Sequence, residues 1–317
     1  MPMSSYPHGF TSGLTVRGMP LTVAHPGKVF FVNNSSAIAE DGIGGSDSNP
    51  GTYQKPFSTI DYAIGRCTSG RGDMILVMPG HVETITAADA ILCDVIGVAI
   101  VGLGTGSLKP RIDFNNTAAT VGVSVDNVTL KNLHFRALIS AVVVGVNVKA
   151  DADDVAIEDC LFTAETAGTD EFNHSIRFVD GNSRCSVAKT TIDMGIAGAV
   201  AGIHLDADTA FLTIEDCVIR GDYSTANITG DTTLSTNLLI QRNLLENGIG
   251  GNLGTEPGIE LLTGSTGTIQ YNNIVCNLAT KAASVVADTC LLFENYYNED
   301  ISSSATGGII GTASADD

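Results

Sequence analysis

The sequence contains no tryptophan, and aromatic residues make up only 6% of a chain whose hydrophobic residues make up 44%. Its apolar content is therefore mainly Val, Ile, Leu and Ala. Charged residues are 16% of the chain, below the usual quarter of a soluble domain, and 35 glycines interrupt it. This composition argues against a helical or a disordered chain and favours a turn-rich, all-β protein.

Basic residues are scarce. The chain has 16 Lys and Arg against 35 Asp and Glu, which gives a formal net charge of −19. Binding to phosphate backbones depends on Lys and Arg, so we expect no nucleic-acid partner. An anionic membrane surface is disfavoured for the same reason, and we interpret the charge as a source of solubility.

Targeting, disulfide and metal signals are also lacking. The first residues show no basic segment followed by an apolar one, and no run of about 18 apolar residues exists to cross a membrane. We therefore expect a protein made in the cytoplasm. The seven cysteines include no Cys-x-x-Cys pair, so we expect buried thiols, no disulfide framework, no metal site and no cofactor.

What the sequence does contain is a repeat. The octad Leu212–Ile219 (Leu-Thr-Ile-Glu-Asp-Cys-Val-Ile) is nearly copied by Val155–Phe162 and more loosely elsewhere. The third residue of each copy serves as an anchor, and successive anchors lie 23 to 30 residues apart. A period of that size indicates a repeat architecture. The anchors are Leu76, Ile100, Leu130, Ile157, Val187, Ile214, Ile240, Ile269 and Leu292.

Each repeat also holds a second β-like run, such as Val142–Val148 or Ala201–Leu205, followed by turns rich in Asp, Asn and Gly. A repeat of this length is too short for a βαβ unit and long enough for one coil of a parallel β-helix. We predict an all-β, single-stranded right-handed parallel β-helix with a short N-terminal cap helix and an extended N-terminal arm. The predicted divisions are an arm at 1–27, a strand, loop and cap helix at 28–72, about nine coils at 73–300 and a tail at 301–317.

Three segments carry a family resemblance. Gly45–Thr52 and Lys55–Ala63, followed by Gly72–Gly80, resemble the opening of right-handed parallel β-helix proteins of the pectate-lyase-like superfamily, in phage virion form. The later coils fit as well, and the resemblance covers about residues 28–300. It implies the fold and not one function, because this fold carries lyases, hydrolases, tailspikes and inert virion parts.

Stacking the coils places sequence positions in columns. Charges of alternating sign fill one column, and we predict a structural ion-pair ladder there rather than a catalytic acid pair. The next column predicts a stack of Asn and Cys side chains at a turn. The ladder is Asp159, Lys189, Asp216 and Arg242, and the turn stack is Cys160, Cys217, Asn243, Asn272 and Asn295.

Glycoside cleavage requires two carboxylates at a defined separation. Asp151, Asp153 and Asp154 share one turn, and Asp206 and Asp208 share another, but Asp is common at turns for local hydrogen bonding. Aromatic platforms for sugars are few. We therefore expect no catalytic residues, with a polysaccharide lyase or hydrolase as the open alternative.

An inert body implies a mechanical or adhesive role. The favoured hypothesis is a capsid decoration (cement) protein, a homotrimer on the outer shell of a phage head that binds the major capsid protein. The alternative is a tailspike or fibre component that binds a host glycan. The candidate partner-binding arm comprises Leu14, Val16, Arg17, Met19 and Leu21.

Overall fold

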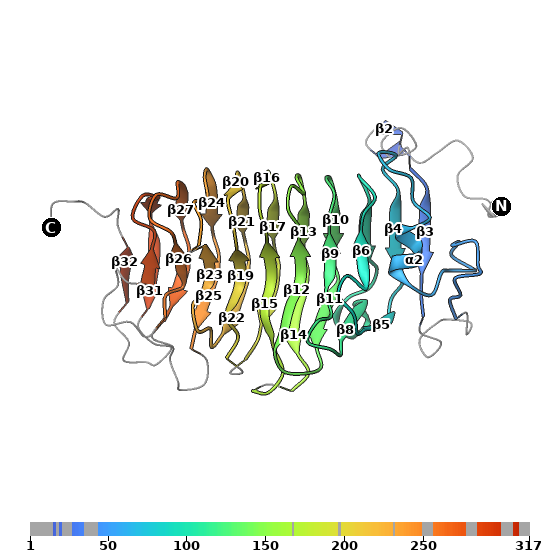
Figure 1. Ribbon diagram of the computed structural model, residues 1–317, viewed down its shortest axis with the longest axis horizontal. Coiled ribbons are helices and arrows are strands. Elements are labelled where there is room, and N and C mark those ends of the chain that lie inside the picture. The colour runs from blue at the N-terminus through green and yellow to red at the C-terminus, as the bar shows by residue number, and fades with distance from the viewer. Residues whose placement is uncertain are drawn as a thin grey trace, which may run out of the picture.

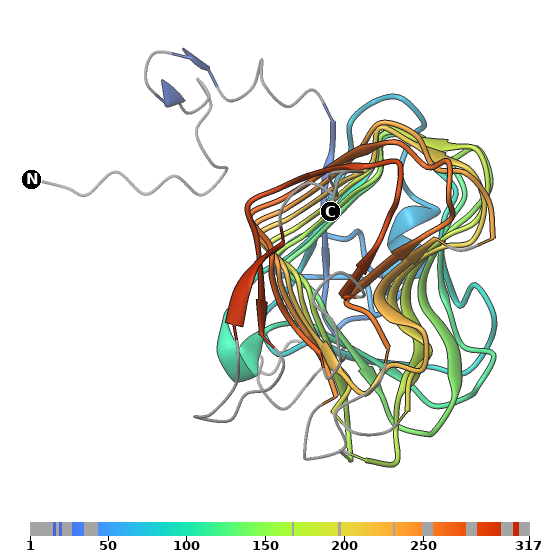
Figure 2. The same ribbon diagram turned by 90° about the vertical axis from the view of Figure 1, so that its left-hand side faces the viewer.

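The computed structural model shows a parallel β-solenoid in which successive coils stack along one axis (Figure 1). Three parallel sheets, here called sheets I, II and III in the order in which each coil visits them, enclose the core (Figure 2). The residues described are 27–34, 44–166, 168–195, 198–230, 232–248, 256–276 and 284–298, with the backbone alone of three strands at 15–16, 19–20 and 307–310.

Sheets I and II have ten strands each, and sheet III has eight. Sheet I contains β3 (Val29–Val32), β4 (Met74–Val77), β7 (Ala99–Gly102), β10 (Thr129–Lys131), β13 (Ala156–Glu158), β17 (Ser186–Ala188), β21 (Thr213–Glu215), β24 (Leu238–Gln241), β27 (Gly267–Gln270) and β30 (Leu291–Phe293). Sheet II contains β5 (Val82–Ile85), β8 (Arg111–Phe114), β11 (His134–Ala137), β14 (Leu161–Ala164), β18 (Thr191–Asp193), β22 (Val218–Gly221), β25 (Leu244–Asn247), β28 (Asn273–Val275), β31 (Asn295–Asn298) and the antiparallel β32 (Gly307–Ile310).

Sheet III contains β6 (Ile91–Cys93), β9 (Val121–Val123), β12 (Val142–Val148), β15 (Phe172–Phe178), β19 (Ala201–Leu205), β23 (Ala226–Gly230), β26 (Ile259–Leu261) and β29 (Val285–Val286). Two short pairs lie apart from these sheets. One joins β16 (Asn182–Ser183) to β20 (Thr209–Ala210), and the other joins β1 (Thr15–Val16) to β2 (Met19–Pro20).

The anchor residues lie in register along sheet I. Ile100, Leu130, Ile157 and their later counterparts pair coil by coil and are buried. The prediction of a parallel β-solenoid is therefore confirmed. The first anchor was wrong by one residue, because Ile75 and not Leu76 pairs with Ile100.

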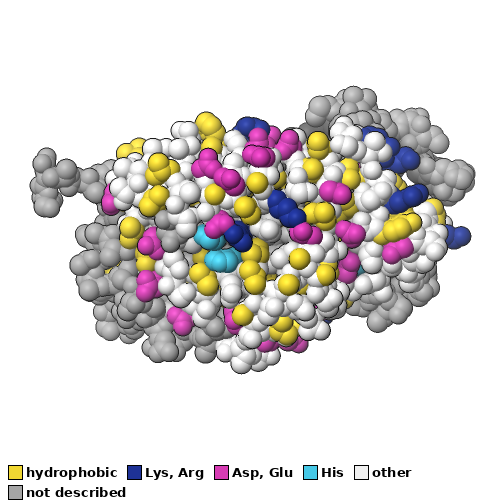
Figure 3. Space-filling model, viewed as in Figure 1, with side chains coloured by type: hydrophobic (Ala, Val, Ile, Leu, Met, Phe, Trp, Pro, Cys, Tyr) yellow, Lys and Arg dark blue, Asp and Glu magenta, His cyan; other side chains and the backbone are white. Residues whose placement is uncertain are grey.

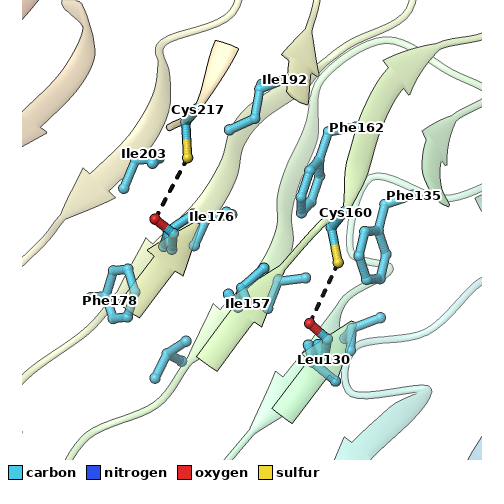
Figure 4. Close-up of a cluster of buried hydrophobic side chains, with 14 of the residues drawn as sticks. Leu130, Phe135, Ile157, Cys160, Phe162, Ile176, Phe178, Ile192, Ile203 and Cys217 are labelled. Carbon is cyan, nitrogen blue, oxygen red and sulfur yellow. Dashed lines mark hydrogen bonds between the residues drawn. The ribbon is translucent and has the colours of Figure 1, made fainter. Parts of the chain in front are cut away.

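The core consists of stacked aliphatic side chains, with phenylalanines between sheets II and III. Phe135 and Phe162 stack with their ring centroids 4.7 Å apart. Cys160 and Cys217 lie in this core, where their thiols donate to carbonyls of the preceding coil (Figure 4). Burial raises the pKa of both thiols to about 12, so they remain neutral.

A short helix covers the N-terminal end of the solenoid. Helix α2 (Ile60–Ile64) begins after Thr59, whose hydroxyl accepts from the Tyr62 amide, and buries Ile60, Ala63 and Ile64. The Ile60 amide donates to Glu83, whose carboxylate also lies 3.3 Å from His81. A 3-10 helix, η2 (Gly106–Leu108), lies in the loop between β7 and β8.

Candidate functional site

Sheets I and II meet at a corner where one residue of each coil has a left-handed backbone. The column occupies the predicted ladder positions, with φ between 44° and 56° from Asn132 through Asp159, Lys189, Asp216, Arg242 and Tyr271 to Glu294. Non-glycine residues adopt this conformation at a cost. The column thus marks a sharp, repeated turn, and its side chains point into solvent.

The ladder residues make fewer mutual contacts than the alternation of sign predicts. Arg242 binds Asp216 at 2.8 Å and also Glu215, and this hydrogen bonding lowers the pKa of Asp216, with a smaller effect of Lys189. Asp159 instead lies under Lys109, whose ammonium donates to the Asp159 carbonyl. Among the described residues Lys189 forms no ion pair. Of the predicted ladder contacts, the described residues thus include the ion pair of Asp216 with Arg242.

The turn stack follows directly inside this corner. Asn243 and Asn272 are buried, and each donates its side-chain amide to the carboxamide oxygen of the next asparagine at 2.9 Å and to an anchor carbonyl. Asn295 ends the row and donates to the Ile269 carbonyl. Cys217 continues the stack toward the N-terminus, since its backbone amide donates to Asn243. These bonds satisfy backbone groups that the sharp turn leaves without a ladder partner.

The outer face of sheet II carries a dense set of ion pairs. Asp113 is 4% exposed, and its carboxylate lies 2.9 Å from both Arg111 and Arg136. Arg136 also binds Glu165, and Arg220 lies 2.7 Å from Glu246 further along the sheet. Charges on this face are therefore neutralised from coil to coil.

The carboxylates that sequence reasoning singled out for cleavage are also engaged. Arg184 binds Asp153 and Asp154, and its hydrogen bond lowers the pKa of Asp154. Arg177 binds Asp206. The structure thus places each of these acids in an ion pair within the chain.

The other turn acids lie close to one another. The neighbouring side chain of Asp208 raises the pKa of Asp180, and Asp151 adds to the effect. Asp208 also accepts from the Gly181 amide at 3.4 Å. This turn follows β12, β15 and β19 of sheet III and forms an acidic border along it.

The outer face of sheet III itself carries a row of polar residues that sequence reasoning missed. Asn147, Arg177, His204 and Thr229 pair in register on successive coils, and Glu260 follows. Each stands between two buried apolar neighbours in most strands, so its side chain points outward. We call Asn147, Arg177, His204, Thr229 and the adjacent His174 the polar strip.

Several polar atoms of the strip are buried without a partner. Asn147 Oδ1, His174 Nδ1, Arg177 Nε and Thr229 Oγ1 have no hydrogen bond within the described part of the chain. The Thr229 residue is only 2% exposed. Such atoms are rare in native proteins and mark places where a water, an ion or a ligand completes the hydrogen bonding.

His174 and His204 stack on this face with their ring centroids 4.5 Å apart. Burial, and then the neighbouring His204 and Arg177, lower the pKa of His174 to about 4. The His174 ring is therefore neutral at pH 7. Figure 3 shows histidine side chains beside a basic and an acidic one on this face.

The strip has a signal in the sequence, although a faint one. Its residues occupy the same place in Val-Asn-Val, Ile-Arg-Phe, Ile-His-Leu and Ile-Thr-Gly on successive coils. The residue type changes at every coil while the position repeats. Stacking the second β-like run of each repeat, as well as the octads, would have revealed it.

The geometry of the described residues also bears on a metal site and on a membrane-spanning helix. No cluster of three or more His, Cys, Asp or Glu side chains there is arranged to hold a metal ion. None of the helices described has the length and apolarity needed to span a bilayer. The residues Leu14, Arg17 and Leu21 of the predicted arm lie outside the described residues, and of Val16 and Met19 only the backbone is described, in β1 and β2.

No protein-family model and no curated protein matches the chain. A rhamnogalacturonan lyase structure has a TM-score of 0.42 and 13% identity, covering 89% of this chain and 79% of the lyase. A lacto-N-biosidase from Eubacterium ramulus has a TM-score of 0.41 and 11% identity, with 84% and 68% covered. The Dettilon tailspike protein has a TM-score of 0.38 and 12% identity, with 78% of this chain and 50% of the tailspike covered. No functional argument below rests on these likenesses.

Proposed function

We propose that this protein is a non-catalytic β-solenoid of a phage particle that binds a glycan on the outer face of sheet III, as a tailspike or fibre component. The observation that carries the proposal is the set of unpartnered polar atoms on Asn147, Arg177 and Thr229. A buried polar group without a partner costs about 1–3 kcal/mol. These atoms have almost no exposed surface, so a sugar would reach them through a bridging water or after a small side-chain shift. Sugar hydroxyls both donate and accept, so they suit a row that holds acceptors and donors together.

We propose no hydrolytic role for the turn acids, because three of them are held in ion pairs. Hydrolysis needs one protonated and one free carboxyl group, about 5 Å or more apart, with the glycosidic bond between them. Asp153, Asp154 and Asp206 are bound by arginines. Asp208 lies close enough to Asp180 to raise the pKa of that carboxyl, which makes the two acids a pair rather than two separate groups.

The test is binding to a panel of immobilised polysaccharides, with release of reducing ends followed in the same samples. We expect retention on at least one polysaccharide and no release of ends. Asn147→Ala should weaken binding about tenfold, since it removes one hydrogen bond to the ligand. Gln241→Ala is the matched control, because Gln241 is a polar outward residue of sheet I that donates to Glu215. Equal binding by both variants would sink the proposal, and so would cleavage.

A second candidate role is capsid decoration, in which a homotrimer binds the major capsid protein on the outer shell of a virion. The pairing of β1 with β2 favours it, because this hairpin joins none of the three sheets of the body. A segment outside the solenoid is free to bind a partner. Deletion of residues 1–27 should abolish co-sedimentation with purified capsids while the body stays folded by circular dichroism. Retained co-sedimentation would exclude the arm as the capsid-binding segment.

A further inference from the structure

We infer that the polar strip selects uncharged glycans and rejects glycans that carry carboxylate or sulfate groups. This inference rests on the proposed function and adds the substrate class. It follows from the charged groups near the unpartnered atoms of Asn147, Arg177 and Thr229. These groups are the basic residues of the strip and the carboxylates at its border.

The strip has no uncommitted cation to offer an anion. Arg177 is its one guanidinium, and its terminal nitrogen already binds Asp206, which also lies 3.8 Å from His204. Lys149, in the turn after β12, is bound to Asp89 at 2.5 Å. Sites for carboxylate or sulfate use arginines whose forks are open to the ligand. Both of these basic groups are therefore held by carboxylates in the part of the chain that the structure describes.

The histidines do not supply the missing charge. His174 and His204 stack face to face, an arrangement in which a proton on one ring disfavours a proton on the other. Burial lowers the pKa of His174 further, to about 4. At neutral pH the His174 ring therefore offers the ligand hydrogen bonding without charge.

Carboxylates border the strip where its strands end. Asp151, Asp180 and Asp208 belong to consecutive coils, with the Asp151 amide donating to the Asp180 carbonyl at 2.8 Å and Asp208 close enough to Asp180 to raise the pKa of that carboxyl. A negatively charged sugar laid along the strip would approach this border without a counter-charge, whereas a neutral sugar meets only hydrogen-bonding groups.

The experiment measures binding of the full chain to matched polysaccharides at low and at physiological salt. Probes are dextran, galactan, mannan and N-acetylated chitooligosaccharides, each compared with a carboxymethylated or sulfated derivative. We expect at least one neutral probe to bind and its anionic derivative to bind at least tenfold more weakly, with a smaller gap at high salt because screening weakens the repulsion.

The matched variants are D180N/D208N, which removes the border charges, and D193N, which removes an exposed acid on sheet II. The double variant should bind the anionic derivative about tenfold better than the parent and the neutral probe equally well, while D193N should change neither. An anionic derivative that binds the parent as tightly as its neutral counterpart overturns the charge selection alone. Binding of no probe, neutral or anionic, overturns the proposed function, and this inference with it.

Discussion

The outer faces of sheets II and III belong to the same coils, but their polar side chains differ in how they are paired. On sheet II, Asp113 lies between Arg111 of its own strand and Arg136 of the next coil, and the side-chain nitrogens without a hydrogen bond, Nε of Arg111 and Arg220, belong to ion-paired arginines. On sheet III, Asn147 and Thr229 hold polar atoms without partners. The ion pairs of sheet II compensate its polar groups, whereas the neutral amide and hydroxyl groups of sheet III have no such compensation, and uncompensated buried polar groups call for a partner such as water or a ligand. This difference supports the proposal that sheet III carries the ligand-binding face.

The largest effect is expected on sheet II. Asp113→Asn keeps the size of the side chain but leaves two arginines without their shared counter-charge. Removing one member of a buried ion pair costs about 3–5 kcal/mol. Urea unfolding should show a loss of that order, with glycan binding intact in the fraction that remains folded. A loss below about 1 kcal/mol would show that sheet II is not held together by these pairs.

The turn stack should rank next. Asn272→Ala deprives the Asn243 amide and the Ile240 carbonyl of their partner. Each unsatisfied buried group costs about 1–3 kcal/mol, so we expect about 2–3 kcal/mol in the same unfolding assay. Asn273→Ala is the control, because the neighbouring Asn273 is exposed and should change stability by less than about 0.5 kcal/mol. Similar losses for the two variants would contradict a structural role of the stack.

The two faces each contain one histidine whose pKa is lowered to about 4, mainly by burial: His134 on sheet II and His174 on sheet III. An unfolded histidine titrates near pH 6.5. Below that pH the unfolded chain gains a proton that the folded chain resists, so stability is full above about pH 6.5 and falls as the pH approaches 4. The loss is on the order of 2 kcal/mol per histidine after allowance for partial exposure.

His174→Gln and His134→Gln should therefore each flatten the fall of stability between pH 6.5 and pH 4, measured by urea unfolding at several pH values. His134→Gln should also cost stability at pH 7, because His134 lies 2.7 Å from the Thr163 hydroxyl, whereas Nδ1 of His174 has no partner. Parallel pH curves for the parent and both variants would contradict this assignment.

The smallest change in stability is expected at Thr229. Thr229→Val removes an unpartnered hydroxyl and keeps the shape, so stability should stay within about 1 kcal/mol of the parent, on the side of a gain. Glycan affinity should nevertheless fall severalfold. A thermal shift assay and a binding assay on the same preparation measure both. A marked destabilisation would mean that the hydroxyl has a partner in solution that is part of the fold.

Sequence periodicity predicted the architecture because burial imposes it. The anchors Ile157 and Val187 pair as expected, and the second β-like runs became the strands of sheet III. The inward-facing residue was predicted wrongly in one strand, Met74–Val77. This strand is apolar throughout, so no alternation of polar and apolar residues shows which side chains point inward. That run could be assigned only once its strand was paired.

The candidate site was harder to predict, for physical reasons. The polar strip repeats in position but not in residue type, so no sequence motif predicts it. Its in-register members are Asn147, Arg177, His204 and Thr229. The pairing of Lys109 with Asp159 depends on the path of a loop whose length differs from coil to coil. Sequence periodicity predicts which side chains point into the core. The ion pairs and unpartnered polar atoms on the outer faces depend instead on how far each side chain extends and on the loops beside it.

The most direct test of the account is an NMR titration of the histidine side chains with a bound glycan. The chain has six histidines, of which His174 and His204 belong to the polar strip and His134 to sheet II. Adding a neutral polysaccharide that binds should shift the ring signals of His174 and His204 and leave those of His134 unchanged. A shift at His134 with His174 and His204 unmoved would contradict the assignment of sheet III as the binding face.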